Sequence, residues 1–343
     1  MKKISLLKIT LLGLILSTLL IGYFYQKLHS PHVRENSIFK ITSGETFAQI
    51  NYRLFKAGLI NDQRIFHYYA KYKKLLTKFK VGEFTIPQGS SIPEVVYILV
   101  SGTPNLTQVT IPEGKNMYEI ADILAANKIT SKKDFLTEVR NKELMKSFSI
   151  PPSSPSLEGY LFPETYKFSP NSSAKYVIKT MLKLFHLKTK NLYFNHPFLS
   201  KHEIINLASI VEKETGAKFE RPLIAGVFTN RLKKKMRLQS DPTTVYGMWD
   251  RYKGNIKKSD LLEYTPYNTY KIPALPLGPI ANPSLEAIEA VLQPAHTNYL
   301  YFVSKNDGTH VFSETYKSHR EAVDAYQKNA QARRGKSWRQ LKQ

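Results

Sequence analysis

The first apolar run of the chain covers residues 4–25, and Lys8 is its only charged residue. At a rise of 1.5 Å per residue, such a helix is about 30 Å long, which is enough to span a bilayer. Lys2 and Lys3 precede the run, so the positive-inside rule predicts a cytoplasmic N-terminus. A cleaved signal peptide is the alternative, but residues 23–25 are Tyr-Phe-Tyr, whereas a cleavage site needs small residues. We therefore expect a retained single-pass anchor in the cytoplasmic (inner) membrane.

A small module of mixed structure is predicted after this anchor. The predicted order is a strand at 39–42, helices at 47–57 and 62–76, a strand at 81–86 and a helix at 92–100. Gly58 is the expected C-cap of the first of these helices. The turn Ser43-Gly44-Glu45-Thr46 resembles the opening of a LysM-type glycan-binding module. A small α+β support domain without a ligand is the plainer alternative.

A second stretch of alternating elements leads to a proline-rich segment. A strand and turn are predicted at 109–114, and helices at 117–126 and 132–139. The segment 151–155, Pro-Pro-Ser-Ser-Pro, is the predicted domain boundary, because proline disfavours helix. The expected fold class is α+β. The predicted parts are a cytoplasmic N-terminus and anchor (1–28), a linker (29–37), a LysM-like module (38–105), a connecting α+β segment with the proline-rich linker (106–155), a larger α+β catalytic domain (156–329) and a basic tail (330–343).

Composition narrows the possible chemistry. The chain of 343 residues contains no cysteine, which excludes a disulfide scaffold, a thiolate metal site and a cysteine nucleophile. Its 50 Lys and Arg against 27 Asp and Glu give 50 − 27 = +23. Such a charge is typical of nucleic-acid or anionic-surface binding. Because the anchor places the chain on the periplasmic (extracytoplasmic) side, we expect phospholipid head groups and peptide carboxylates as its anions, and no nucleic acid.

Metal and nucleophile motifs are incomplete. His202-Glu203 begins the zinc motif His-Glu-x-x-His, but Asn206 stands where the second histidine is required. The segment 172–175 matches Ser-x-x-Lys but lacks the companion motifs of that enzyme class. We therefore expect no metal and no cofactor.

A carboxyl group is the remaining candidate for chemistry. Apolar residues at helical spacing predict a helix over 202–214, and Glu212 lies on a face neighbouring the apolar stripe, beside the small residues Ala208 and Ser209. That position leaves room for a ligand, and partial burial would keep a carboxyl group protonated, as a general acid requires. An ordinary surface glutamate is the alternative.

Neighbouring segments suggest partners for this helix. Glu214 is expected to pair with an arginine such as Arg221 or Arg231. The Asp-Pro pair at 241–242 predicts that residues 239–241 form a loop entering a helix. Loops rich in Tyr, Asn and Gln suit sugars, because rings stack on C–H faces and amides bond hydroxyls. Alternatively, the prolines of these loops only stiffen connections.

Several motifs, taken in order, resemble the YceG-like family of endolytic murein transglycosylases, from the anchor onward. The matching segments are 157–166 (Leu-Glu-Gly-Tyr-Leu-Phe-Pro-Glu-Thr-Tyr), 208–215 (Ala-Ser-Ile-Val-Glu-Lys-Glu-Thr), 237–243 (Arg-Leu-Gln-Ser-Asp-Pro-Thr), 267–270 (Tyr-Asn-Thr-Tyr), 276–283 (Pro-Leu-Gly-Pro-Ile-Ala-Asn-Pro), 299–303 (Tyr-Leu-Tyr-Phe-Val) and 308–312 (Gly-Thr-His-Val-Phe). Glu164 and Leu277 depart slightly from the family pattern.

The resemblance implies a substrate and a site. It implies cleavage of peptidoglycan between N-acetylmuramic acid and N-acetylglucosamine to 1,6-anhydro ends on nascent strands, which terminates strand elongation. It also implies that the protein acts together with peptidoglycan synthases or penicillin-binding proteins. The family pattern puts the catalytic acid at Glu212. The candidate substrate-binding residues are Glu158, Tyr160, Gln239, Ser240, Asp241, Tyr267, Asn268, Tyr270 and Asn282.

Two other functions stay open at the level of sequence. One is a muramidase-type hydrolase that uses Glu212 with Asp241, since hydrolases of that kind need two carboxylates. The other is a non-catalytic wall-binding scaffold that acts through the LysM-like module. The sequence further predicts that Glu212→Gln abolishes cleavage with little loss of stability.

Overall fold

A computed structural model of the chain describes residues 6–42 and 44–328. The predicted basic tail, Ser43 of the predicted LysM-like turn and the lysines at positions 2 and 3 lie outside these residues. The chain forms two compact units, the smaller of residues 1–107 with 167–172 and the larger of 108–166 with 173–343. Helices and three two-stranded sheets make up the described chain, which confirms the α+β class.

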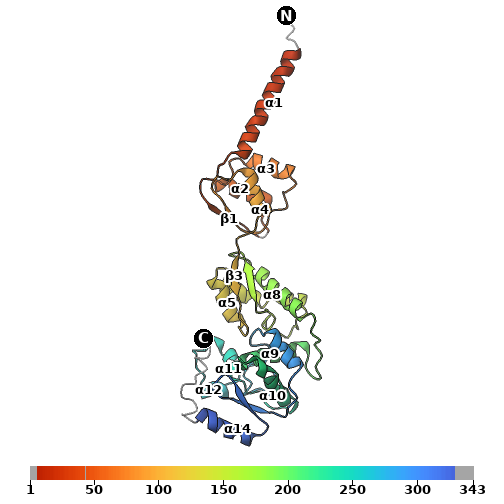
Figure 1. Ribbon diagram of the computed structural model, residues 1–343, viewed down its shortest axis with the longest axis vertical. Helices are drawn as coiled ribbons and strands as arrows, with labels where there is room; N and C mark the ends of the chain where they lie inside the picture. The colour runs from red at the N-terminus through yellow and green to blue at the C-terminus, as the bar shows by residue number, and fades with distance from the viewer. Residues whose placement is uncertain (1–5, 43, 329–343) are drawn as a thin grey trace. The chain divides into compact units, whose positions relative to one another are not determined.

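The predicted anchor is a helix that ends on the smaller unit. Helix α1 (Leu6–His29) contains the stretch 10–29, which is long and apolar enough to cross a membrane. The apolar side chains along the middle of α1 are exposed. At its end, Leu28 packs against the core of the smaller unit, and the Lys27 carbonyl accepts a hydrogen bond of 3.0 Å from Asn61 Nδ2. Figure 1 shows α1 leaving this unit as a single long helix.

The smaller unit follows the predicted order of elements. Its elements after α1 are β1 (Ser37–Ile41), α2 (Phe47–Lys56), α3 (Gln63–Tyr72), β2 (Gly82–Ile86) and α4 (Ile92–Val100). Thr46 and Gln49 form a capping box at the start of α2, and Asp62 caps α3, so the helices begin where the polar residues predict. Strands β1 and β2 pair antiparallel, with Phe39 opposite Phe84 in the core. The likeness to a LysM module stays a prediction.

The larger unit holds most of the helices. Strands β3 (Thr107–Thr110) and β4 (Thr165–Phe168) each have residues in both units. The other elements of the larger unit are α5 (Met117–Ala126), α6 (Lys132–Glu138), α7 (Lys142–Ser147), α8 (Ala174–Thr189), α9 (Lys201–Glu214), the turn η1 (Lys218–Glu220), α10 (Arg221–Lys233), α11 (Asp241–Gly247), the turn η2 (Trp249–Arg251), α12 (Lys258–Leu262), α13 (Leu285–Leu292), β5 (Tyr301–Ser304), β6 (His310–Ser313), α14 (Tyr316–Val323) and η3 (Asp324–Lys328). Strand β3 pairs with β4, and β5 pairs antiparallel with β6.

The proline-rich segment 151–155 lies within the larger unit. Ile150 and Leu157 on either side of it are buried, and the Leu157 N–H donates to the Val139 carbonyl at 2.9 Å. These contacts hold the segment against the helices that precede it. The domain boundaries drawn from sequence at 105 and 155 stay predictions.

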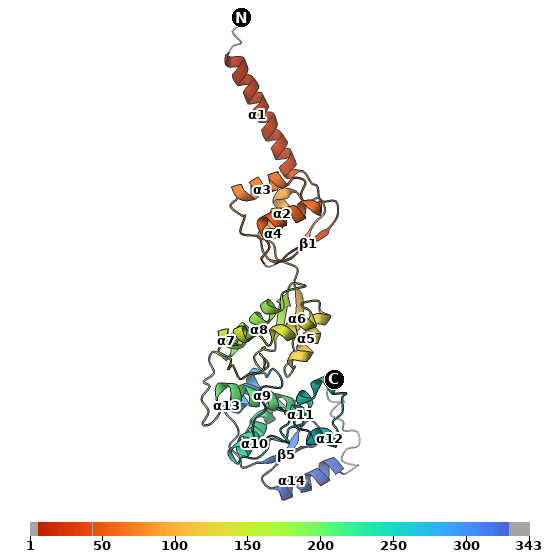
Figure 2. The ribbon, with the colours of Figure 1, turned by 180° about the vertical axis from the view of Figure 1, so that it is seen from behind.

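Three helices form the framework that carries the site. Helices α9, α10 and α13 pack against one another, as Figure 2 shows from behind. Helix α9 begins at a capping box of Ser200 and Glu203, and its residues from Ile204 to Val211 are all buried. Because α9 is apolar on several faces, other helices cover its middle, and its charged groups lie in the first and last turns.

Candidate active site

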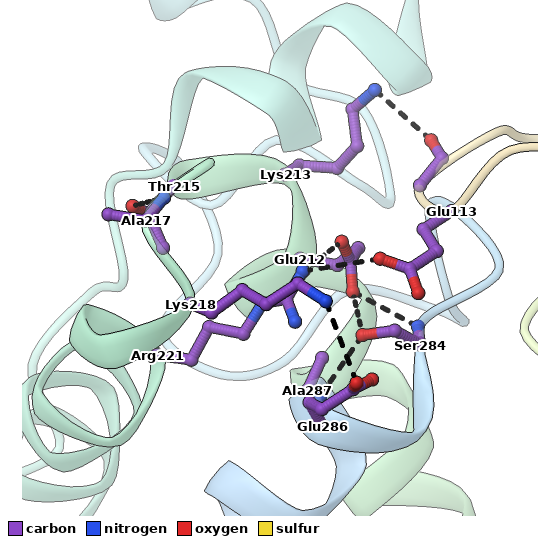
Figure 3. A network of polar contacts seen from close by, with 11 residues as sticks. Glu113, Glu212, Lys213, Thr215, Ala217, Lys218, Arg221, Ser284, Glu286 and Ala287 are labelled. Atoms are coloured by element: carbon purple, nitrogen blue, oxygen red, sulfur yellow. Dashed lines mark hydrogen bonds and ion pairs between the residues drawn. The ribbon is translucent and has the colours of Figure 1, made fainter. Parts of the chain in front are cut away.

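Glu212 lies in the last turn of α9 and has an arginine as its ion-pair partner. Arg221 Nη2, at the start of α10, is 2.8 Å from Glu212 Oε1. Both side chains are nearly covered, with 4% of Arg221 and 6% of Glu212 exposed. Among the described residues, Nε and Nη1 of Arg221 have no hydrogen-bond partner, so its charge depends on the carboxylates beside it. Figure 3 shows the guanidinium group of Arg221 pointing at the carboxylate of Glu212.

Ser284 holds the second oxygen of the same carboxylate. Its backbone N–H and its Oγ donate to Glu212 Oε2 at 3.0 Å and 2.5 Å. Ser284 is the N-cap residue of α13, so the positive end of that helix faces the carboxylate as well. The small residues Ala208 and Ser209 lie on the same side of α9, and Ser209 Oγ accepts from the Ile280 N–H at 3.0 Å. The chain from 280 to 284 therefore lies against this side of α9.

A second carboxylate and a backbone loop complete this cluster. Glu113 Oε2 lies 3.5 Å from Arg221 Nη2, and the Glu113 side chain is 44% exposed. Lys213 Nζ donates to the Gly114 carbonyl at 3.2 Å, on the other side of the helix end in Figure 3. The loop between β3 and α5 is thus tied to the last turn of α9, and it presents one solvent-accessible carboxylate next to Glu212.

A buried network of Glu158 and Asn282 supports the segment that leads to Ser284. Asn282 Oδ1 accepts from the N–H groups of Gly159 and Leu161, both at 2.9 Å, and Nδ2 donates to the Lys115 carbonyl at 3.0 Å and to Glu158 Oε1 at 2.6 Å. Both side chains are buried. Protein groups use the amide of Asn282 fully, so this predicted sugar ligand holds the framework instead.

Glu158 is enclosed in the same way. Its Oε2 accepts from the Met117 N–H at 2.8 Å and from the Tyr246 hydroxyl at 3.1 Å. Gly159 next to it has φ +88°, and a Cβ there would lie 2.6 Å from Pro279 Cγ, so only glycine fits this turn. The 157–161 segment can therefore pass directly beneath the loop that carries Asn282.

Glu214 belongs to a separate cluster. Ser240 Oγ donates to Glu214 Oε1, and the Tyr270 hydroxyl donates to Asp241 Oδ1 at 2.6 Å. The predicted pairing of Glu214 with Arg221 is wrong, because Arg221 turns to Glu212 on the other side of the helix end. Arg231 contributes its charge to the surroundings of Glu214 and donates to the Leu238 and Leu300 carbonyls. Burial, together with the charge of Asp241, raises the pKa of Glu214 to about 7, and the Ser240 hydrogen bond and the Arg231 charge oppose this shift.

The other residues predicted to bind sugar differ in how far they are buried. Gln239 is exposed in the loop before α11 with φ +51°, and α11 begins at Asp241 as the Asp-Pro pair predicts. Asn268 is fully buried, and its Nδ2 donates to the carbonyls of Asp260, Leu261 and Glu263. Tyr160 is buried with its hydroxyl 2.8 Å from His202 Nδ1, near the start of α9.

Comparison with known proteins identifies the family of this chain. A family described as YceG-like matches residues 39–325. A protein of Bacillus subtilis (strain 168) named endolytic murein transglycosylase is 35% identical over 302 residues, which is 83% of this chain and 83% of the relative. The chain belongs to the YceG-like family.

Two further proteins resemble this YceG-like chain. An endolytic murein transglycosylase of Streptococcus pneumoniae (strain R6) is 32% identical over 295 residues, which cover 77% of this chain and 53% of that protein. The crystal structure of a yceG-like protein from Listeria monocytogenes matches with a TM-score of 0.56 at 31% identity, over 84% of this chain and 99% of that one.

The sequence prediction gives Glu212 none of its three polar neighbours in this YceG-like protein, which are Arg221, Ser284 and Glu113. The sequence analysis expects Arg221, or alternatively Arg231, beside Glu214, and it names neither Ser284 nor Glu113 as a partner of Glu212. A local signal existed for Ser284 alone, because a serine after Asn-Pro and before an apolar helical run is a typical N-cap. Nothing in the sequence near Glu113 indicates that it faces α9.

The burial of Glu158 predicts a pH dependence of stability. Desolvation raises the pKa of Glu158 to about 8, well above its ordinary value of 4.5. Between these values the folded chain holds a proton that the unfolded chain has lost, so this contribution to stability is present below pH 4.5 and disappears as the pH rises through 8.

Chemical unfolding of Glu158→Gln and of the parent chain from pH 5 to pH 9 measures this effect. The glutamine side chain does not titrate, so the parent should lose roughly 2–5 kcal/mol relative to the variant over this range. A difference between the two that stays constant with pH would contradict the assignment.

Proposed function

We propose that this chain is a membrane-anchored lytic transglycosylase that cleaves the glycan strands of peptidoglycan. Curated relatives at 32–35% identity are named endolytic murein transglycosylases, which supports the activity. The observation that carries the proposal in the structure is the carboxylate of Glu212, held by Arg221 on one oxygen and by Ser284 on the other. Glu212 is the proposed catalytic acid.

One carboxyl group suffices for the proposed reaction. Glu212 gives its proton to the glycosidic oxygen between N-acetylmuramic acid and N-acetylglucosamine, and the C1–O bond breaks through an oxocarbenium-like transition state. Arg221 and Ser284 stabilise the carboxylate left behind and hold it in place. The carboxylate then takes the proton of the C6 hydroxyl as that oxygen attacks C1 of the same sugar. A 1,6-anhydro end forms, and no water is consumed.

The contacts of Glu212 favour this reaction over hydrolysis with Asp241. Among the described residues, Asp241 is not a contact of Glu212; it accepts a hydrogen bond from Tyr270 in the Glu214 cluster. Glu113, which shares Arg221 with Glu212, is the second carboxylate at the site. A hydrolase built on this fold would therefore use Glu113 to activate water or to stabilise the oxocarbenium ion. Hydrolysis leaves reducing ends and the lyase reaction leaves anhydro ends, so the product ends distinguish the two reactions.

The membrane attachment and the partners are part of the proposal. Leu28 and the Lys27 carbonyl integrate the end of α1 into the smaller unit, which supports a retained helix over a cleaved signal peptide. The N-terminus would lie in the cytoplasm and the two units outside it. There the chain would bind glycan strands through the larger unit and a LysM-like module. It would work beside peptidoglycan synthases or penicillin-binding proteins, cutting nascent strands and ending their elongation.

Product masses test the proposed function. Purified glycan strands are digested with the full-length chain in detergent, and the fragments are weighed. Fragments lighter by one water than reducing-end fragments are expected, because the anhydro bond replaces hydrolysis. Reducing ends would instead favour the muramidase. Strands left intact by the parent chain would point to a wall-binding scaffold, and a digestion by Glu212→Gln run alongside controls for contaminating enzymes.

A further inference from the structure

A groove lined by aromatic rings lies in the larger unit, apart from the contacts of Glu212. Its volume is about 410 Å³, and Tyr118, Tyr246, Trp249 and Tyr267 contribute rings to its walls. Tyr118 stacks nearly parallel on Trp249, with ring centroids 5.7 Å apart and an interplanar angle of 11°. Tyr246 meets Tyr267 at 4.8 Å between centroids. Tyr118, Trp249 and Tyr267 are half-buried, so each ring keeps an accessible part.

The charges that line the groove nearly cancel, so the groove has no net positive charge for an acidic ligand. Arg140 already donates to the Tyr118 hydroxyl at 3.3 Å and to the Leu136 carbonyl, and Arg251 is ion-paired with Glu263. Asp250, which also lines the groove, adds an exposed negative charge. The Asp250 charge offsets that of Arg140, so the carboxylates of a peptide stem find no surplus of positive charge in the groove. The C–H faces of a neutral sugar, in contrast, suit accessible aromatic rings.

The groove and the proposed acid border the same short segment. A Cβ on Gly114 would lie 3.4 Å from Glu212 Cγ, and the groove begins at Met117 and Tyr118. Four residues span at most about 14 Å of chain. The groove therefore lies close enough to Glu212 for one bound polymer to contact both.

Hydrogen bonds also connect the groove with the acid. The groove residue Tyr246 donates to Glu158, and Asn282 donates to the other oxygen of Glu158. Asn282 is separated from Ser284 by one proline, and Ser284 donates to Glu212. The walls of the groove and the support of the catalytic carboxyl group are thus parts of one buried network.

We propose that this groove is a sugar-binding subsite, in which a residue of the glycan strand away from the cleaved bond stacks on Trp249 and Tyr118. The inference rests on the proposed function, because it names where that substrate binds. Trp249 is then a specificity-determining residue that distinguishes long strands from short fragments.

Tryptophan fluorescence tests the subsite directly, because the chain has two tryptophans. Trp338→Phe leaves Trp249 as the only reporter, and Glu212→Gln in the same full-length chain prevents cutting during the titration. The probes are glycan strands freed of their peptides and the free stem tetrapeptide. A saturable change with the strands and none with the peptide is expected. A saturable change with the peptide alone would overturn the subsite.

Cleavage by the Trp338→Phe chain with Glu212 intact separates the two proposals. Cutting without any fluorescence response would overturn the subsite and leave the proposed function standing. A response to strands without cutting would support the subsite and contradict the lyase activity. Neither response nor cutting would overturn both.

Kinetics of groove variants give a second measurement. Trp249→Ala should raise KM for long strands by about tenfold and change kcat by less than about twofold. Trp249→Phe should restore most of the affinity, which a merely disrupted fold would not. Tyr264→Ala, an aromatic residue 70% exposed and outside the groove, is the matched control and should leave KM unchanged. An unchanged KM in Trp249→Ala, with a melting temperature like that of the parent, would overturn the subsite.

Discussion

Glu212→Gln is expected to lower kcat for glycan cleavage by about three orders of magnitude or more. A correctly placed acid or base contributes 10²–10⁴-fold, and here one group is proposed to serve both steps. A glutamine amide can neither give the first proton nor take the second. The rate is measured from the release of anhydro-ended fragments under saturating substrate, where a loss confined to binding would not appear.

The same substitution should also destabilise the fold, contrary to the expectation from sequence. Arg221 is almost fully buried, and Glu212 is its closer carboxylate partner. Removing one partner of a buried ion pair leaves the other charge uncompensated, which costs up to about 3–5 kcal/mol. Glu113 at 3.5 Å offsets part of this cost, so we expect about 1–3 kcal/mol.

The matched control for Glu212→Gln is the same substitution two residues further on. Glu214 ends the same helix but bonds to Ser240, so Glu214→Gln should retain cleavage within about tenfold. Both variants are assayed well below their melting temperatures. If Glu212→Gln cleaves as fast as Glu214→Gln, Glu212 is not the catalytic acid.

Asn282→Ala is expected to lower the free energy of unfolding of the larger unit by about 4 kcal/mol or more. The Asn282 side chain is fully buried and makes four hydrogen bonds, to Gly159, Leu161, Lys115 and Glu158. Each buried partner left unsatisfied costs about 1–3 kcal/mol. Asn282 holds the segment that carries Ser284, and Ser284 donates to Glu212. The rate of cleavage should therefore fall as well, even in the fraction of molecules that stays folded.

Denaturant unfolding checks this value against an exposed asparagine. The exposed Asn127 side chain has one described hydrogen bond, from Nδ2 to the Ile123 carbonyl one helical turn earlier, and Asn127→Ala should change stability by no more than about 0.5 kcal/mol. A loss below 1 kcal/mol for Asn282→Ala would mean that the network does not hold the site together.

Local rules account for the parts of the fold that the sequence predicts well. The helix predicted at 117–126 has the observed bounds of α5, and an asparagine capping box starts it. The strand and helix order of the smaller unit follows from apolar periodicity and from polar residues at the turns. The family resemblance likewise rests on short contiguous motifs, so it can be read without knowing which of them touch.

The sequence by itself thus determined the apolar helix, the α+β class, the family and Glu212 as the candidate acid. Only the tertiary structure decided how that acid is held, because its partners are far apart along the chain. Ser284 lies 72 positions from Glu212, and Asn282 lies 124 positions from Glu158. Periodicity places a residue on a face of its own helix, but the packing of other elements against that face selects its hydrogen bonds. For this reason Glu158 and Asn282, predicted to bind sugar, hold the framework, and Arg221 pairs with Glu212.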